Sequence, residues 1–418
     1  MLYPELDIVS SGPPPDGGVQ AWSQVFAGHL VLWTTWGYIN SFGYFQAHYI
    51  ETFHKSVSDV SWIVGVQIFL LCFGATFSGR LFDAGYYRHL LIAGFLFQIV
   101  GIFTTSVAKE YWQAFLAQGI CGGMAATLLW PTHISLISTW FLKSRSFAIA
   151  LMLCGTSVGG MVWIVIAQQL GPTLGFGWTV RVIGFMVTGF FAIVLVLTRT
   201  RIPPREGGPF LELAAFKETS YSLFVAGAFL ILWAVYFAFF YVNQYATNII
   251  HVNAKTSLSI LYLMNGVSVI GRIVPAIIAD RFPLILGPVN MFLILSISSG
   301  IIMYSWIAVH DLGGIIAFSA VYGFFGAGLQ GLFAAALASL TKDLQKIGVR
   351  VGMVLTVASI PSLTGPPLAG TLIQEDNGRY LYTQIWGGTC LVVGGFAILA
   401  ASLYARKEEK RARANESA

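Results

Sequence analysis

The sequence predicts an all-α polytopic membrane protein, with twelve transmembrane helices in two similar six-helix bundles. Three observations support this prediction: the composition, the number of long apolar runs and a repeat between the halves of the chain. Of the 418 residues, 56% are hydrophobic and only 10% are charged, whereas a soluble globular domain carries about 25% charged residues. So few charges could not cover the surface of a soluble protein.

Twelve apolar runs divide the chain. A membrane-spanning helix requires about 20 mainly apolar residues. The runs lack the alternating pattern of β-barrel strands, so each is predicted as a helix. They lie near residues 22–46, 60–82, 89–108, 112–138, 145–170, 178–198, 221–247, 257–279, 285–308, 313–340, 350–373 and 382–404.

These spans predict five segments: an N-terminal tail, a six-helix bundle, a charged central loop, a second six-helix bundle and a basic C-terminal tail. The segments cover residues 1–20, 21–198, 199–219, 220–404 and 405–418. The N-terminal tail lacks the basic start and short apolar core of a cleavable signal peptide, so we expect it to be retained. The four cysteines lie inside apolar runs and indicate core residues rather than disulfides or a metal site.

The basic residues predict the orientation. Twelve in loops and five in the C-terminal tail lie on the side of the two termini, and four lie on the opposite side. Because cytoplasmic loops carry an excess of Lys and Arg, both termini are predicted in the cytoplasm, and we expect the plasma membrane as the location. The basic tail then indicates contact with anionic lipids of the bilayer rather than with a nucleic acid.

The two halves repeat short features at the ends of corresponding spans. Gly79-Arg80-Leu81-Phe82-Asp83 closes the second span, and Asp280 closes the eighth span 197 residues later. Arg145 opens the fifth span and Arg350 opens the eleventh, with an offset of 205 residues. Two six-helix halves with a site between them near the bilayer midplane are typical of transporters.

These features resemble the major facilitator superfamily. Residues 79–83 with Arg88 are similar to its loop motif between helices 2 and 3, although the basic run is thinner. Pro15-Asp16-Gly17-Gly18-x3-Trp22 and the segment from Trp140 to Gly160 resemble the entries to helices 1 and 5 of the monocarboxylate porter family. The resemblance extends over nearly the whole chain and is greatest to the fungal branch, whose members carry organic acids, vitamins and secondary metabolites.

The chain departs from the proton-coupled animal members of that family. Those members carry a Lys in helix 1 and an Asp four residues before an Arg in helix 8. The Arg matches Arg272, but Ser268 stands at the Asp position and Asn40 lies near the Lys position. All 18 acidic residues fall in loops, tails or span ends. Proton coupling by the animal mechanism is therefore not expected, and the coupling ion stays open.

Arg272 is the principal candidate for binding the substrate. It lies eight residues before Asp280, about 12 Å inside the helix end. A charge at that depth is costly unless it is paired or hydrated, and a guanidinium binds a carboxylate through two parallel hydrogen bonds. We therefore predict a small-molecule substrate, an organic anion or a metabolite. The alternative is an Arg that caps the carbonyl groups of a broken helix or extends toward the interface.

Further polar and aromatic residues recur at helical spacing on the spans that line the cavity in this superfamily. Such stripes also serve ordinary helix packing, and a lone His in a helix is often a structural hydrogen-bonding group. The candidates on these spans are His29, Trp36, Asn40, Trp130, His133, Tyr236, Asn243 and Gln330. Asn265 and Ser268 are candidates for the same site because they share the helical face of Arg272.

Charged residues at the tail-side helix ends are predicted to form a latch that pairs across the bundles when the inside is closed. The alternative is a topology signal with helix capping. The latch candidates are Arg80, Asp83, Arg88, Arg145, Asp280, Arg281 and Arg350.

The sequence predicts a transporter that works by alternating access, secondary-active or facilitative, and not an enzyme. Uptake and efflux stay open, and we expect a monomer. A phosphate-binding loop and metal-ligand spacing are both missing, so neither cofactor nor metal is expected. Two alternatives remain: a nutrient sensor built on a transporter fold and, with less support, a membrane-embedded enzyme.

Overall fold

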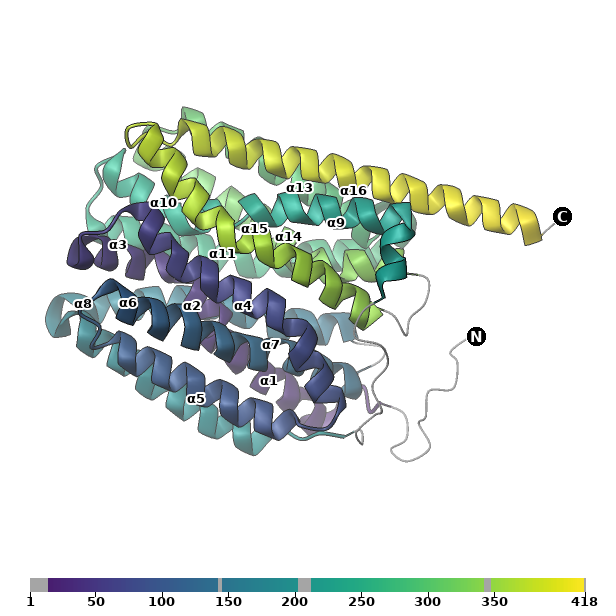
Figure 1. Cartoon of the computed structure of the whole chain (residues 1–418), viewed down its shortest axis with the longest axis horizontal. Coiled ribbons are helices and arrows are strands. Elements are labelled where there is room, and N and C mark those ends of the chain that lie inside the picture. Colours follow the sequence, from purple (N-terminus) through teal and green to yellow (C-terminus); the bar gives the residue numbers. More distant parts are fainter. Residues whose placement is uncertain (1–13, 142–144, 202–211, 342–346, 417–418) are drawn as a thin grey trace.

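The computed structural model describes residues 14–141, 145–201, 212–341 and 347–416, and these residues form helices without any strand. Two bundles lie side by side, the N-terminal one in purple and blue and the C-terminal one in green and yellow (Figure 1). The first described helix begins and the last one ends at the same end of the molecule, which we call the tail end. The opposite end is called the far end.

The N-terminal bundle begins with a broken helix. Its elements are α1 (Gly18–Thr34), α2 (Trp36–Asn40), α3 (Phe42–Phe53), α4 (Val57–Asp83), α5 (Tyr87–Thr105), α6 (Tyr111–Ala114), the π-helix η1 (Phe115–Cys121), α7 (Gly122–Trp140) and α8 (Arg145–Leu197). The elements of the C-terminal bundle are η2 (Leu213–Lys217), α9 (Thr219–Ala234), α10 (Phe237–Asn248), α11 (Ala254–Arg281), α12 (Pro283–Leu286), α13 (Pro288–Ser305), η3 (Trp306–Ala308), α14 (Leu312–Leu340), α15 (Ile347–Glu375) and α16 (Leu381–Glu416).

The helices agree with the predicted twelve spans. Ten described helices are long and apolar enough to cross a membrane. One of them, α8, contains the fifth and sixth predicted spans, which join at Gly175, where the left-handed φ of 74° suits glycine. The first predicted span is divided among α1, α2 and α3, pieces of 17, 5 and 12 residues. Nine of the ten helices each correspond to one predicted span, α8 supplies two spans, and the divided first span is the twelfth.

The first and seventh spans break at corresponding places. α1 gives way to α2 at Thr35, and α9 gives way to α10 at Val235 and Tyr236. A break leaves backbone carbonyl groups without helical partners, and neighbouring side chains supply them. Gln98 Nε2 donates to the carbonyl oxygen of Thr34 at 2.9 Å, and the Tyr322 hydroxyl donates to the carbonyl oxygen of Val235 at 3.0 Å. Irregular backbone of this kind is typical of substrate sites in transporters.

Two pairs of helices form most of the interface between the bundles: α4 with α15, and α8 with α11. Glycines allow the close approach. A Cβ on Gly65 of α4 would lie 2.5 Å from the carbonyl oxygen of Leu363 on α15. A Cβ on Gly160 of α8 would lie 2.5 Å from Asn265 Oδ1 on α11. Larger residues at these positions would force the bundles apart.

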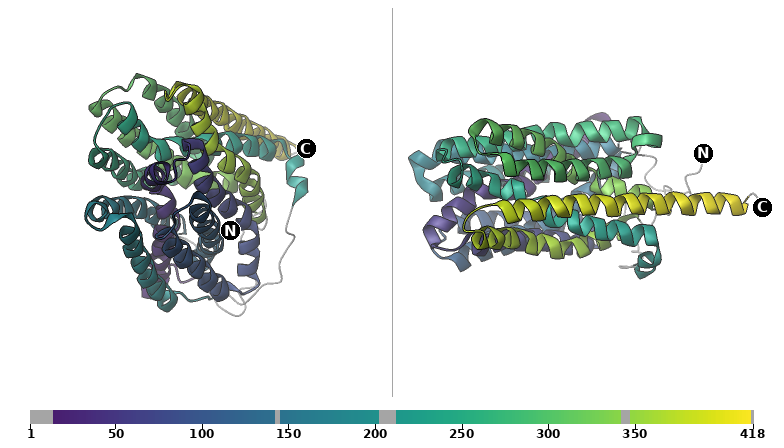
Figure 2. Two further views of the ribbon diagram at one scale, coloured as in Figure 1. Left: turned by 60° about the vertical axis from the view of Figure 1, so that its left-hand side comes forward. Right: turned by 90° about the horizontal axis from the view of Figure 1, so that it is seen from above.

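The last helix is longer than its predicted span, which ended at residue 404. α16 continues to Glu416 and extends past the other helices at the tail end (Figure 2). The segment after residue 404 is rich in Ala, Arg, Lys and Glu, which are strong helix formers. The basic tail therefore continues the membrane helix up to Glu416.

Candidate functional site

Arg272 is buried at the middle of the interface between the bundles. It lies nine residues before the end of α11 at Arg281, about 14 Å from the tail end of that helix, and its exposed fraction is 5%. Nη1 donates a hydrogen bond to Ser157 Oγ of α8, and Nη2 donates to Gln330 Oε1 of α14 at 3.1 Å. Within the described ranges, no carboxylate lies at ion-pair distance from Arg272. The guanidinium is thus held by neutral acceptors.

Small residues place Arg272 next to Gln330. A Cβ on Gly271 would lie 2.2 Å from the carbonyl oxygen of Phe324, and one on Gly323 would lie 2.6 Å from that of Met264. α11 and α14 therefore approach backbone to backbone. This close packing brings the neighbouring Arg272 within reach of the Gln330 amide.

Small residues also direct Ser157 toward Arg272. A Cβ on Gly155 would lie 2.2 Å from the carbonyl oxygen of His29, and one on Gly159 would lie 2.4 Å from that of Trp33. The two glycines, four residues apart, therefore face α1. Ser157, midway between them, points to the opposite side of the helix, where α11 lies.

Three aromatic rings meet beside the helix breaks. Trp36 of α2 stacks on Tyr236 of the other bundle, with ring centroids 5.9 Å apart and planes inclined by 21°. Trp130 of α7 meets Trp36 edge to face, also at 5.9 Å. In the described structure the buried Nε1 atoms of Trp36 and Trp130 have no hydrogen-bond partner. Tyr236 lies within electrostatic range of Arg272, so we group the rings and the guanidinium as one region, which we call the central site.

Two asparagines lie close to the central site. The side chain of Asn265 donates to the carbonyl oxygen of Leu261 at 3.1 Å, and its buried Oδ1 has no partner among the described residues. Asn40 Nδ2 donates to the carbonyl oxygen of Thr156 at 3.4 Å. Asn265 Oδ1 and the two indole Nε1 atoms are therefore polar atoms of the central site that have no partner in the described structure.

Other predicted site residues are engaged in helix packing. His133 Nδ1 lies 2.7 Å from the carbonyl oxygen of Leu129, and its Nε2 lies 3.1 Å from the Tyr87 hydroxyl. Ser268 donates to the carbonyl oxygens of Met264 and Gly323, at 2.7 and 3.0 Å. These contacts favour the structural alternative for both residues.

His29 and Asn243 also contact backbone groups of neighbouring helices. His29 Nδ1 lies 3.0 Å from the carbonyl oxygen of Leu151 on α8. Asn243 Nδ2 donates to the carbonyl oxygen of Gly43 in the other bundle at 3.3 Å, toward the far end. The structure therefore connects Asn243 with closure of the far end, and a role for either residue in binding substrate stays a prediction.

Among the latch candidates, Arg350 forms a network within its own bundle. Arg350 Nε donates to Glu212 Oε2 at 3.0 Å, and Nη1 donates to Glu218 Oε2 at 2.8 Å. The Tyr221 hydroxyl donates to the backbone carbonyl of Arg350 at 3.0 Å. In this conformation Arg350 joins α15 to the segment that leads into α9. Neither glutamate is predicted from the sequence as a site residue. The feature that could have indicated them is their position at the end of the charged central loop.

The remaining latch candidates stay predictions. Arg88, Asp280 and Arg281 are exposed, and Arg80 is half-buried and engaged in contacts. The side chains of Asp83 and Arg145 lie outside the part of the structure that is described.

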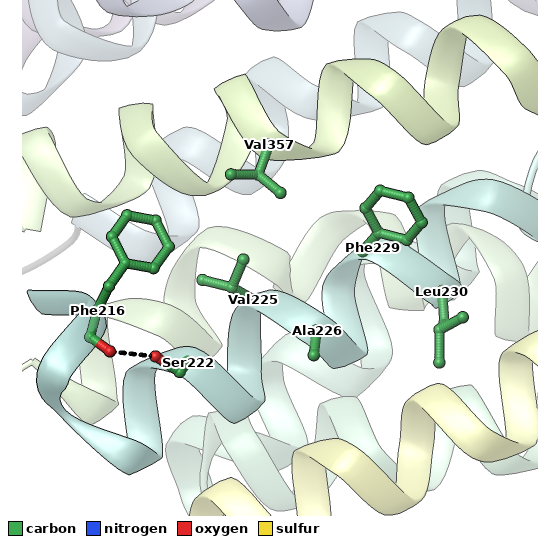
Figure 3. A pocket seen from close by; sticks show the side chains of 7 residues that line it. All are labelled: Phe216, Ser222, Val225, Ala226, Phe229, Leu230 and Val357. Carbon is green, nitrogen blue, oxygen red and sulfur yellow. Dashed lines mark hydrogen bonds between the residues drawn. The ribbon is translucent and has the colours of Figure 1, made fainter. Parts of the chain in front are cut away.

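A shallow apolar groove lies between α9 and α15, away from the central site (Figure 3). It is lined by Phe216, Ser222, Val225, Ala226, Phe229, Leu230 and Val357. The Ser222 hydroxyl donates to the carbonyl oxygen of Phe216 at 2.6 Å, so its polar group is already engaged. The groove has no charged lining residue to select an ion.

Known proteins support the assignment of the fold. The model of the Major Facilitator Superfamily matches residues 25–309. An MFS-type transporter of Gibberella zeae is 39% identical over 95% of this chain and 90% of its own length. The aspyridones efflux protein of Emericella nidulans is 35% identical over 94% of this chain and 80% of its own length.

A solved structure shares the fold at low sequence identity. It is a bacterial homologue of the human lysosomal transporter Spinster in an inward-facing, occupied conformation. The TM-score is 0.66 at 13% identity, covering 92% of this chain and 96% of the other. The matching superfamily model, the relatives and this fold agree: the chain belongs to the Major Facilitator Superfamily and is a multi-pass membrane transporter.

Proposed function

We propose that this chain exports a small organic anion, by alternating access of the central site to the two sides of the membrane. The observation that carries the proposal is the buried Arg272, which has neutral hydrogen-bond partners and no carboxylate partner among the described residues. A buried charge in a membrane is costly without a counter-charge. A substrate carboxylate would supply that counter-charge, since it accepts stronger hydrogen bonds from a guanidinium than the neutral groups of Ser157 and Gln330 do.

The aromatic groups support an acid with a flat, partly apolar body. Trp36 and Tyr236 come from different bundles, so a molecule between them would contact both halves of the transporter. The indole N–H groups of Trp36 and Trp130 would donate to carbonyl or hydroxyl oxygens of such a molecule. Arg272 would then select the charge, and the rings would select the shape.

The direction of transport is proposed from a relative. The aspyridones efflux protein is named for export, and its match covers 94% of this chain. We place the tail end in the cytoplasm because the basic residues are concentrated there, and we assign the chain to the fungal branch of the monocarboxylate porter family. The substrate would then enter the central site from the cytoplasm and leave at the far end, through the plasma membrane.

Loading sealed vesicles with a panel of aromatic and aliphatic acids would test this proposal, with release measured for the wild type, Arg272→Lys and Arg272→Gln. Arg272→Lys keeps the charge but loses the planar fork of donors, so transport should fall markedly. Release by Arg272→Gln should fall to the rate measured for loaded vesicles that contain no protein. Arg181→Gln is the matched control, because Arg181 contacts Ser106 and Trp178 within the N-terminal bundle. Normal release by Arg272→Gln at equal protein level would overturn the anion site.

A further inference from the structure

The two acceptors of Arg272 belong to different bundles. Gln330 lies on α14, in the same bundle as Arg272, whereas Ser157 lies on α8 of the other bundle. The hydrogen bond to Ser157 therefore connects the bundles through the residue proposed to bind the substrate. Any acceptor that takes the Arg272 donors from Ser157 also removes a connection between the bundles.

We propose that the Arg272–Ser157 hydrogen bond is a latch between the bundles, which an organic anion releases when it binds Arg272. This inference rests on the proposed function for the ligand, but the latch itself is a separate property of the empty transporter. Ser157 then acts as a positioning residue: it holds Arg272, and through it α11, while the site is empty.

The position of this bond along the interface supports the proposal. Toward the far end, Gln168 of α8 donates to the carbonyl oxygen of Lys255 at 2.6 Å and to Ser259 Oγ at 3.1 Å. Next along the interface, Gly160 packs against Asn265. The bond from Arg272 to Ser157 is, in the described structure, the hydrogen bond between α8 and α11 that lies nearest the tail end. Its loss would free the tail-side parts of both helices.

The chemistry of the competing acceptors gives the direction of the effect. A carboxylate accepts a charge-assisted, bidentate pair of hydrogen bonds from a guanidinium, which is stronger than one bond to a neutral hydroxyl. A ligand shifts a conformational equilibrium only if it favours one of the two states. An anion that displaces Ser157 favours states in which α8 and α11 are no longer held together at this point, so binding at the centre releases the empty transporter from the described conformation.

Cys154 provides a probe that needs no identified substrate. It lies three residues from Ser157 on α8, on the same side of the helix, and its exposed fraction is 5%. In a background with Cys72, Cys121 and Cys390 replaced by Ala, the rate of Cys154 alkylation by N-ethylmaleimide reports opening of this part of the interface. Ser157→Ala should raise the rate about tenfold, as expected for the loss of one hydrogen bond to a charged group.

Two matched variants separate the latch from a general packing defect. Ser157→Thr keeps a hydroxyl and should restore a slow rate. Thr156→Ala removes the adjacent hydroxyl, which donates to the carbonyl oxygen of Leu153 within α8, and should leave the rate unchanged. Equal rates for Ser157→Ala and the wild type, or equal acceleration by Thr156→Ala, would overturn the latch.

A double variant and an added anion separate the latch from the anion site. Arg272→Gln should accelerate alkylation, and adding Ser157→Ala to Arg272→Gln should change the rate no further, because both substitutions remove the same bond. Added benzoate should accelerate alkylation of the wild type and leave Arg272→Gln unaffected. A wild-type rate that benzoate leaves unchanged or lowers would contradict release of the latch. Loss of transport in Arg272→Gln with an unaltered alkylation rate would retain the anion site and remove the latch.

Discussion

The two ends of the interface between the bundles are built from different chemistry. At the far end, neutral groups connect the halves: Ser58 Oγ donates to the carbonyl oxygen of Pro367 at 2.9 Å, and the hydroxyls of Ser61 and Tyr241 lie 2.6 Å apart. At the tail end the predicted latch residues are charged, and the described pairs of Arg350 stay within one bundle.

This difference indicates how the transporter could change state. Neutral hydrogen bonds and glycine contacts act over a short distance, so they are lost as soon as two helices separate. Charged groups keep an interaction over a longer distance and can exchange partners. The described conformation is closed at the far end. Toward the tail end, the hydroxyl oxygens of Thr76 on α4 and Thr356 on α15 lie 3.2 Å apart. Thr76 lies about 10 Å before the tail end of α4.

The largest expected effect comes from Gly65, at the tightest glycine contact between α4 and α15. In Gly65→Ala the new Cβ would lie 2.5 Å from the carbonyl oxygen of Leu363, so the helices must separate. Transport should fall about tenfold or more, which corresponds to about 1.4 kcal/mol. A single cysteine at Val60, which is 0% exposed, should become reactive to an impermeant maleimide. Gly189→Ala is the control, because nothing lies within 4 Å of that position.

Arg350→Gln tests whether the tail-end charges act within one bundle or between bundles. It leaves the carboxylates of Glu212 and Glu218 without their shared cation, and loss of one partner of a buried pair costs about 3–5 kcal/mol. We expect less than this, because Glu218 is 44% exposed. The melting temperature should fall while maleimide labelling at Val60→Cys stays at the wild-type level. A changed labelling rate at unchanged stability would favour the latch of charged tail-side residues that the sequence predicts between the bundles, rather than the Arg272–Ser157 bond.

Tyr241→Phe should have an intermediate effect at the far end. The Tyr241 hydroxyl contacts Ser61 and donates to the carbonyl oxygen of Pro366 at 2.7 Å, so its removal takes away two hydrogen bonds, each worth a net of about 0.5 kcal/mol at the low end of the usual range. Labelling of Val60→Cys should rise several-fold. Tyr322→Phe serves as the comparison, because that hydroxyl bonds to Val235 inside one bundle. If both variants label alike, the hydroxyl of Tyr241 is not part of the far-end closure.

The smallest expected effect is that of pH. Ser268 stands where the resemblance to the monocarboxylate porter family predicts an acid in proton-coupled members, and both ring nitrogens of His133 are engaged in contacts. Transport should change less than about twofold across the range in which histidine titrates. A steep one-proton dependence that disappears in His29→Gln would instead assign the proton to His29.

The sequence predicts most of the fold because apolar runs of about 20 residues have one stable arrangement in a bilayer. It does not predict the breaks of the first and seventh spans, since they depend on partners such as Gln98 and Tyr322 on other helices. The π-helix Phe115–Cys121 has no Pro or other local marker either. The last predicted helix also ends too early. The prediction separates the basic tail from the membrane span because of its charge, although the residues of that tail favour a helix.

The sequence likewise predicts only some of the residues of the central site. Arg272 stands out in the sequence because a charge inside an apolar run is rare. Ser157 does not, because one Ser among small residues is common in membrane helices. Only the packing of Gly155 and Gly159 against α1 determines that Ser157 faces α11. His133 has the spacing of a cavity stripe and Ser268 shares the helical face of Arg272, yet the hydrogen bonds of both residues lie within the helix packing.

The most direct test of the central claim compares an aromatic acid with its uncharged methyl ester in the wild type and in Arg272→Gln. Binding of both compounds to the purified protein would be measured by titration calorimetry. The wild type should prefer the acid by at least about tenfold, as expected for a charge-assisted pair, and Arg272→Gln should bind both compounds equally weakly. An acid preference of the same size in Arg272→Gln would contradict the account, because the charge would then be recognised elsewhere.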